Sequence, residues 1–115
     1  MKIIETDNAP KAIGTYSQAV KVNGLLFISG QIPLDPSTME LVEGIENQIN
    51  QVFENINQIL KADGMDFSNV VKLSVLLDDL NHFEKVKEIM VSIFSKPYPA
   101  RAAYEVSKFC LLLHI

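Results

Sequence analysis

The fold is decided by residues 44–64, which read GIENQINQVFENINQILKADG. Within them, apolar side chains recur at steps of three and four residues: Ile45, Ile49, Val52, Phe53, Ile56, Ile59 and Leu60. This spacing puts the apolar side chains on one face of an α-helix, which must pack against another element. Gly64 is suited to end the helix, because glycine readily adopts a left-handed backbone. We therefore predict an amphipathic helix over residues 44–64.

A strand and a second helix are predicted directly after this helix. Residues 69–77 (NVVKLSVLL) alternate, which predicts a strand with one buried face formed by Val71, Leu73, Val75 and Leu77. The opposite face carries Val70, Lys72, Ser74 and Leu76. N-cap chemistry for a second helix comes from Asp78, Asp79 and Asn81. Its apolar stripe is formed by Phe83, Val86, Ile89, Met90, Ile93 and Phe94, and it should stop before Pro97 and Pro99.

Extended segments flank these helices on both sides. Short strands are predicted over Lys2–Glu5, 16–22, 25–29 and 101–107. Asn23-Gly24 separates two apolar runs, which is a strong signal for a hairpin. Two amphipathic helices and several strands indicate an α+β fold with both helices on one face of a sheet. The other sheet face must be solvated or packed against further copies of the chain.

Length and composition exclude several classes of protein. The chain has 115 residues, 48% of them hydrophobic and 21% charged, which predicts one globular domain over residues 1–115. No stretch approaches the ~20 apolar residues of a membrane span, and the N-terminus lacks the apolar run of a signal peptide. One cysteine, Cys110, cannot form an internal disulfide and favours a cytoplasmic, reducing setting. A net charge of −4 argues against nucleic acid as a partner.

Several common kinds of site have no counterpart in the sequence. The five glycines are scattered, so no phosphate-binding loop is predicted, and no pair of His or Cys residues has metal-ligand spacing. We expect His82 to lie at the surface and His114, near the terminus, to be structural or frayed. Cys110 lies among leucine and phenylalanine residues and is expected to act as a small buried apolar residue.

Three polar segments beside turns stand out: residues 12–19, 28–33 and 98–103. Gly30 would let backbone N–H groups approach a small ligand closely, although Ser29-Gly30 also suits an ordinary turn. Arg101 follows a proline-rich loop, and its planar fork suits a carboxylate, although a surface ion pair is the alternative. The spacing of these segments alone supports a pocket for a small anion.

Five longer runs follow in order from about Asn8 to Val106: APKAIGTYSQAV, LLFISGQIPLDP, QINQVFENINQIL, VVKLSVLLDDLNHFEKV and YPARAAYEV. Together they resemble the RidA/YjgF family. The resemblance implies a chorismate-mutase-like α+β fold and a homotrimer with a central barrel. It also implies hydrolysis of reactive enamines and imines, such as 2-aminoacrylate and 2-iminobutanoate, to 2-keto acids and ammonia, with no metal or cofactor.

The resemblance assigns roles to particular residues. Arg101 resembles the family arginine that binds the substrate carboxylate, and Tyr16 resembles the tyrosine that lines the cleft. Ser29 and Gly30 resemble the pair at a strand end that contacts the ligand. Lys87 stands where many active members have asparagine, and it could contact a substrate carboxylate or be solvated.

Other positions depart from the family pattern. Thr15 replaces a proline, and Ala103 stands where some members carry cysteine. The family's acidic last strand is replaced from about residue 107, and its water-activating glutamate would fall just past Ile115. We therefore expect carboxylate binding with weakened or absent imine hydrolysis. The alternatives are a non-catalytic trimeric binder of small carboxylates and, less favoured by the charge, an endoribonuclease or translation inhibitor.

Overall fold

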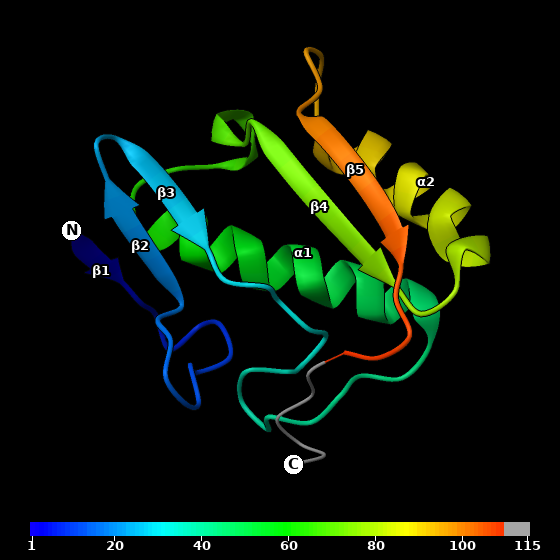
Figure 1. Ribbon diagram of the computed structural model, residues 1–115, viewed down its shortest axis with the longest axis horizontal. Helices are drawn as coiled ribbons and strands as arrows, with labels where there is room; N and C mark the ends of the chain where they lie inside the picture. The colour runs from blue at the N-terminus through cyan, green and yellow to red at the C-terminus, as the bar shows by residue number, and fades with distance from the viewer. Residues whose placement is uncertain (110–115) are drawn as a thin grey trace. The chain divides into compact units, whose positions relative to one another are not determined.

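The computed structural model describes residues 1–109, which fall into two compact units, Met1–Asp66 and the residues from Phe67 onward (Figure 1). The expectations for Cys110 and His114 lie outside the described residues. The prediction that residues 1–115 form a single domain stays a prediction. None of the helices within residues 1–109 is both long and apolar enough to cross a lipid bilayer.

The first unit contains an antiparallel sheet in the order β1-β2-β3, formed by Lys2–Ile4, Ala19–Val22 and Leu25–Ile28. The predicted hairpin is confirmed, because Asn23 and Gly24 alone connect β2 to β3. Both residues have positive φ, 51° and 77°, as a two-residue turn of type I′ requires. The strand predicted over 16–22 begins later, at Ala19.

The two faces of this sheet differ in exposure. Register places Ile4, Ala19 and Ile28 in one row, and Ile4 and Ala19 are buried together with Ile59 of the following helix. The next row, on the other face, includes Ile3 and Phe27, and the side chain of Phe27 is 59% exposed. The sheet therefore has a packed face and an exposed apolar face.

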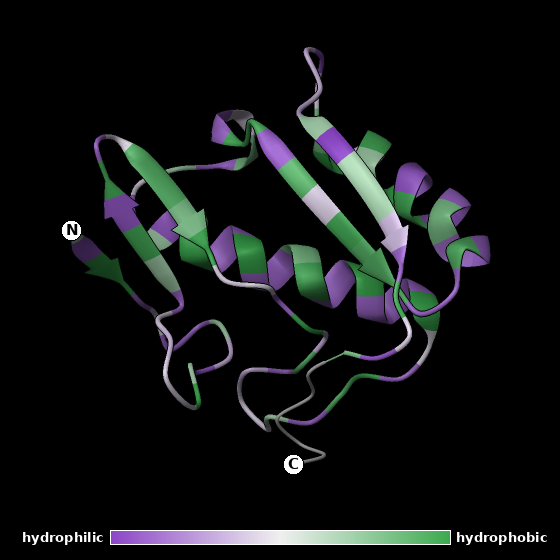
Figure 2. Cartoon of the chain, in the orientation of Figure 1, coloured by the Kyte–Doolittle hydropathy of each residue, from purple (hydrophilic) through white to green (hydrophobic). Residues whose placement is uncertain are grey.

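The predicted first helix is observed as α1, Ile45–Ala62. Its bands of hydrophobic and hydrophilic residues alternate along the axis (Figure 2). The buried members of the predicted stripe are Ile49, Phe53, Ile59 and Leu60. The helix ends at Ala62, and Gly64, two residues later, adopts the expected left-handed backbone with a φ of 70°. Gly64 N donates to Lys61 O and Met65 N to Leu60 O, which is the Schellman pattern of hydrogen bonds.

The second unit contains a parallel pair of strands, β4 (Lys72–Leu77) and β5 (Ala100–Glu105). A parallel pair needs a long crossover, which here consists of the 3₁₀ turn η2 (Leu80–His82) and the helix α2 (Phe83–Ile93). The predicted N-cap lies one turn earlier than expected: Asp79 Oδ1 accepts a hydrogen bond from Asn81 N at 2.8 Å and caps η2. The helix α2 follows η2 directly, with His82 at its N-cap and no side-chain cap.

The start of the predicted strand 69–77 was wrong. Residues Phe67–Asn69 form a 3₁₀ turn, η1, and β4 begins only at Lys72. Val71 therefore precedes the strand and is 73% exposed rather than buried. From Lys72 onward the predicted alternation of exposure holds: Leu73, Val75 and Leu77 are less exposed than the residues between them.

Candidate functional site

Arg101 is the second residue of β5, paired in register with Leu73 of β4. Side chains alternate along a strand, so Arg101, Ala103 and Glu105 share one face of β5. This face lies toward α2 and η2: Arg101 contacts Met90, and Glu105 Oε1 accepts from Leu80 N at 3.0 Å. The register of β5 thus aims the arginine at α2.

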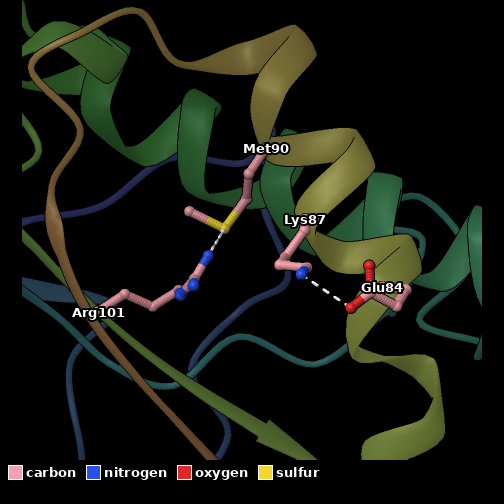
Figure 3. A network of polar contacts seen from close by, with 4 residues as sticks. All are labelled: Glu84, Lys87, Met90 and Arg101. Atoms are coloured by element: carbon pink, nitrogen blue, oxygen red, sulfur yellow. Dashed lines mark hydrogen bonds and ion pairs between the residues drawn. The ribbon is translucent and has the colours of Figure 1, made fainter.

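Two neutral side chains of α2 hold the guanidinium of Arg101. Its Cζ lies over the ring of Phe83, 4.7 Å from the centroid. Its Nη1 donates to the sulfur of Met90 at 3.7 Å (Figure 3). Among residues 1–109, no carboxylate forms an ion pair with this guanidinium. The positive charge of Arg101 is therefore available, within the described residues, to an external anion.

Lys87 belongs to the same cluster, but its charge is paired. It lies one turn after Phe83 on α2, and its Nζ is 5.7 Å from the centroid of that ring. Lys87 Nζ forms an ion pair with Glu84 Oε1 at 2.8 Å (Figure 3). A ligand carboxylate that approached Lys87 would compete with Glu84, whereas at Arg101 it would meet no such competitor within residues 1–109.

Tyr16 lies in the first unit, on the loop that precedes β2. Its side chain is 46% exposed, and its hydroxyl oxygen accepts a long hydrogen bond of 3.4 Å from Ile13 N. The proton of the hydroxyl is not used in that contact. Gly14 has a φ of 118° beside the tyrosine ring, a backbone conformation that side chains other than glycine rarely adopt. The loop can thus present the hydroxyl as a donor.

Ser29 and Gly30 follow directly after β3. Ser29 N donates to Gln18 O at 2.9 Å, and Ser29 Oγ donates to Ser17 O at 2.6 Å. Gly30 is exposed, and a Cβ added there would meet nothing within 4 Å. The fold of this unit therefore does not require glycine at position 30, and the backbone there is open to a ligand.

The predicted site residues form two groups, one in each unit. Ser29 is bonded to residues that directly follow Tyr16, so the structure links Tyr16, Ser29 and Gly30. Arg101 and Lys87 share the Phe83 ring.

Three contributing residues were missed in the sequence. Phe83 and Met90 were assigned to a core stripe, although their spacing from Lys87 of four and three residues places all three on one helix face. Gln18, almost fully buried, anchors the Tyr16 loop: its Nε2 donates to the carbonyl oxygens of Thr6, Ala9 and Pro10. No periodic pattern marks such a glutamine.

An open surface depression on α1 contains none of these residues. It is lined by Val42, Glu43, Asn47, Asn50, Gln51 and Glu54. Among the described residues that line it, the charged groups are the carboxylates of Glu43 and Glu54, which repel an anion. A site for a small carboxylate therefore does not fit there.

Fold and site together define the class: an α+β protein with an arginine fork available to a small anion. The family model described as Endoribonuclease L-PSP matches residues 6–112. A curated relative from Mus musculus, named 2-iminobutanoate/2-iminopropanoate deaminase, is 51% identical over 107 residues, covering 92% of this chain and 79% of the relative. The chain therefore belongs to the Endoribonuclease L-PSP family, in which the resemblance to RidA/YjgF proteins had placed it.

Solved structures agree with this assignment. RidA from an Antarctic Psychrobacter species matches with a TM-score of 0.92 and 51% identity, over 96% of this chain and 89% of that one. TdcF of E. coli, solved with bound serine, matches with a TM-score of 0.87 and 34% identity, over 96% and 89%. The predicted α+β, RidA-like fold is confirmed, and the trimeric barrel stays a prediction.

Proposed function

We propose that this protein hydrolyses small 2-imino acids, such as 2-iminobutanoate and the imine form of 2-aminoacrylate, to 2-keto acids and ammonia. The observation that carries the proposal is the Arg101 guanidinium, which two neutral side chains hold and no carboxylate within residues 1–109 neutralises. The 51% identity to a protein named for this activity supports it.

The reaction needs little from the protein beyond positioning. Water adds to the carbon of the protonated C=N bond and loses one proton to solvent, which gives a neutral carbinolamine. A proton moves from oxygen to nitrogen, the C–N bond breaks with its electron pair going to nitrogen, and ammonia leaves. The carbonyl of the 2-keto acid forms in the same step. Because the iminium is already electrophilic, holding it still beside water supplies much of the rate gain.

Each predicted residue has a role that its environment supports. Arg101 would bind the substrate carboxylate with two parallel N–H bonds, since within residues 1–109 only its Nη1 is engaged, by a weak sulfur acceptor. Tyr16 would donate its hydroxyl proton to the substrate or the water. Gly30 would offer its backbone, and Ser29 would fix that backbone rather than donate its own hydroxyl to the ligand. Lys87 would act at the margin, because Glu84 holds it.

A coupled assay tests the proposal. A threonine dehydratase generates 2-iminobutanoate from threonine, and the rate at which 2-ketobutyrate and ammonia appear is measured with and without the protein. We expect acceleration by the unaltered protein and its loss in Arg101→Ala, with Arg101→Lys in between because lysine cannot form the bidentate pair. No acceleration at any protein concentration would refute the hydrolase.

A non-catalytic binder of small carboxylates is the second candidate. The structural neighbour TdcF was solved with bound serine, which is itself a small carboxylate. Calorimetric binding of 2-ketobutyrate that Arg101→Ala abolishes, with no turnover by either protein, would favour this candidate over the hydrolase.

We also propose that the protein works as a homotrimer. The outer face of β1-β2-β3 exposes Ile3, Val22, Leu25 and Phe27, and Leu76 and Tyr104 lie exposed side by side on β4 and β5. Apolar surface of this kind is typical of faces that other subunits cover. Sedimentation should give a stable trimer, and a monomer at micromolar concentration would contradict it.

A further inference from the structure

We propose that Phe83 is a positioning residue, which holds the guanidinium of Arg101 ready for the substrate carboxylate through its aromatic ring. This inference rests on the proposed function, because it assigns Arg101 the task of binding that carboxylate. Phe83 begins α2, and the centroid of its ring lies 4.7 Å from Arg101 Cζ, inside the range of a cation–π contact.

The kind of contact matters as much as its distance. An arginine is often fixed by a carboxylate of its own protein, and an incoming anion must then displace that carboxylate. Here the ring of Phe83 and the sulfur of Met90 restrain the guanidinium without neutralising it. The substrate carboxylate therefore meets a charged fork that is already oriented.

The donors of the fork stay open in this arrangement. A guanidinium carries five N–H donors, and the ring contact is not a hydrogen bond to any of them. Within residues 1–109, the one recorded hydrogen bond from the Arg101 side chain goes from Nη1 to a thioether sulfur, a weak acceptor. Two parallel N–H bonds to a carboxylate remain possible from the other donors.

The ion pair between Lys87 and Glu84 makes the two cations at the Phe83 ring differ in their charge compensation. Lys87 contacts the same Phe83 ring, but its Nζ forms an ion pair with Oε1 of Glu84, also on α2, at 2.8 Å. Glu84 thus neutralises the lysine and not the arginine (Figure 3). Phe83 has aromatic contact with both cations, and only Arg101 remains without a carboxylate in the described part of the chain.

The experiment compares two substitutions of similar size: Phe83→Leu removes the aromatic ring, and Phe83→Tyr keeps it. Calorimetry with 2-ketobutyrate measures affinity, and the NMR signal of the Arg101 Nε–H, assigned through Arg101→Lys, reports the ring. A ring beneath the guanidinium should displace this signal by its ring current. Val91→Ala, at an exposed position of the same helix, is the matched control.

We expect Phe83→Leu to raise the Kd for 2-ketobutyrate about 3- to 30-fold and to remove the ring-current shift, as loss of a cation–π contact predicts. Phe83→Tyr should keep both within about twofold, since the tyrosine ring also attracts cations. Val91→Ala should change neither. If Phe83 had a purely structural role, Phe83→Leu would lower the stability of the protein, and Phe83→Tyr would not preserve the affinity for 2-ketobutyrate or the ring-current shift.

The outcomes separate the two proposals. Unchanged affinity in a folded Phe83→Leu protein, while Arg101→Ala abolishes binding, would overturn the positioning role alone. Equal and negligible binding by the unaltered protein and Arg101→Ala would overturn the proposed function and the positioning role with it. If Phe83→Leu fails to fold, the Arg101 signal of the unaltered protein decides: a ring-current shift supports the role and its absence refutes it.

Discussion

The hydroxyl of Ser29 donates a hydrogen bond to the carbonyl oxygen of Ser17 across 2.6 Å. The backbone N–H of the same serine donates to Gln18 O, so Ser29 ties the end of β3 to the residues that follow Tyr16. Its hydroxyl proton is thus committed to the chain. The family resemblance suggests a ligand contact for this serine, whereas its hydrogen bonds indicate that it holds the Tyr16 loop in place.

Ser29→Ala should accordingly lower the stability of the protein more than it affects the binding of 2-ketobutyrate. The change leaves the half-buried Ser17 carbonyl without its side-chain donor, which should cost about 1 kcal/mol in the free energy of unfolding. Urea denaturation measures this cost, with the exposed Ser95→Ala as control. If Ser29→Ala reduced 2-ketobutyrate affinity as strongly as Arg101→Ala at unchanged stability, the hydroxyl would be a direct ligand contact after all.

Gln18→Glu should destabilise the protein strongly, although it changes one atom. The Gln18 side-chain amide donates to three carbonyl oxygens and accepts from Thr6 N at 2.7 Å. A carboxylate keeps the acceptor but places a buried charge against those carbonyls, at a cost of about 2–4 kcal/mol. Thermal denaturation checks this. The same amide-to-acid change at exposed Asn81 should cost less than about 0.5 kcal/mol, and equal costs at the two positions would contradict the account.

Local patterns in the sequence were sufficient for much of the fold. The Asn23-Gly24 pair predicts its own hairpin because both residues tolerate the positive φ values that the turn requires. The apolar stripe of α1 and the glycine after it predict the helix and its end, since both signals lie within a few turns of each other. Such features depend on neighbours in the chain and can be read without tertiary contacts.

Features that depend on distant residues could not be predicted in this way. Asn55 interrupts the apolar stripe of α1 and is fully buried, because its Nδ2 donates to Leu34 O at 3.0 Å, 21 residues away. The apolar spacing assigned Phe83 to the core, whereas in the structure its ring contacts Arg101 of β5. The sequence motif indicated the arginine but not the side chains that hold it.

Lys21→Met should weaken the first unit. Lys21 Nζ lies 2.9 Å from Asp63 Oδ2, and the Asp63 side chain is only 6% exposed, against 33% for Lys21. The contact lacks hydrogen-bond geometry at Oδ2, so charge attraction is the main interaction. Asp63 also caps the C-terminus of α1, where the helix dipole disfavours a carboxylate. Without the ammonium, this nearly buried carboxylate is left uncompensated.

The expected loss is about 1–3 kcal/mol, below that of a fully buried pair because Lys21 reaches solvent. Denaturation in urea measures it, and Lys21→Arg should retain most of the stability. Lys2, which pairs in register with Lys21 on β1, provides the control. Lys2→Met removes a like-charged neighbour and should cost nothing. A cost for Lys21→Met no larger than for Lys2→Met would show that the ion pair contributes little.

Asp35 should titrate at a lower pH than an ordinary aspartate. The Ser37 hydroxyl and the Ser37 N–H both donate to its Oδ1, at 2.6 and 2.8 Å, and hold its pKa below the usual 3.8. Hydrogen bonds to the charged form favour that form, so they stabilise the loop above about pH 3.8. The stabilisation is lost as the pH falls through the lowered pKa, where the folded carboxylate takes up its proton.

A carboxyl titration by NMR checks this, with a midpoint for Asp35 below 3.8 in the unaltered protein. Ser37→Ala should move the midpoint up toward that value, because it removes the hydroxyl donor, the largest cause of the lowered pKa. Thr38→Ala should leave the midpoint in place, since Thr38 acts on this carboxylate through its backbone N–H, which alanine retains. An upward shift of equal size in both variants would mean that general loosening of the loop, and not the serine hydroxyl, sets the pKa of Asp35.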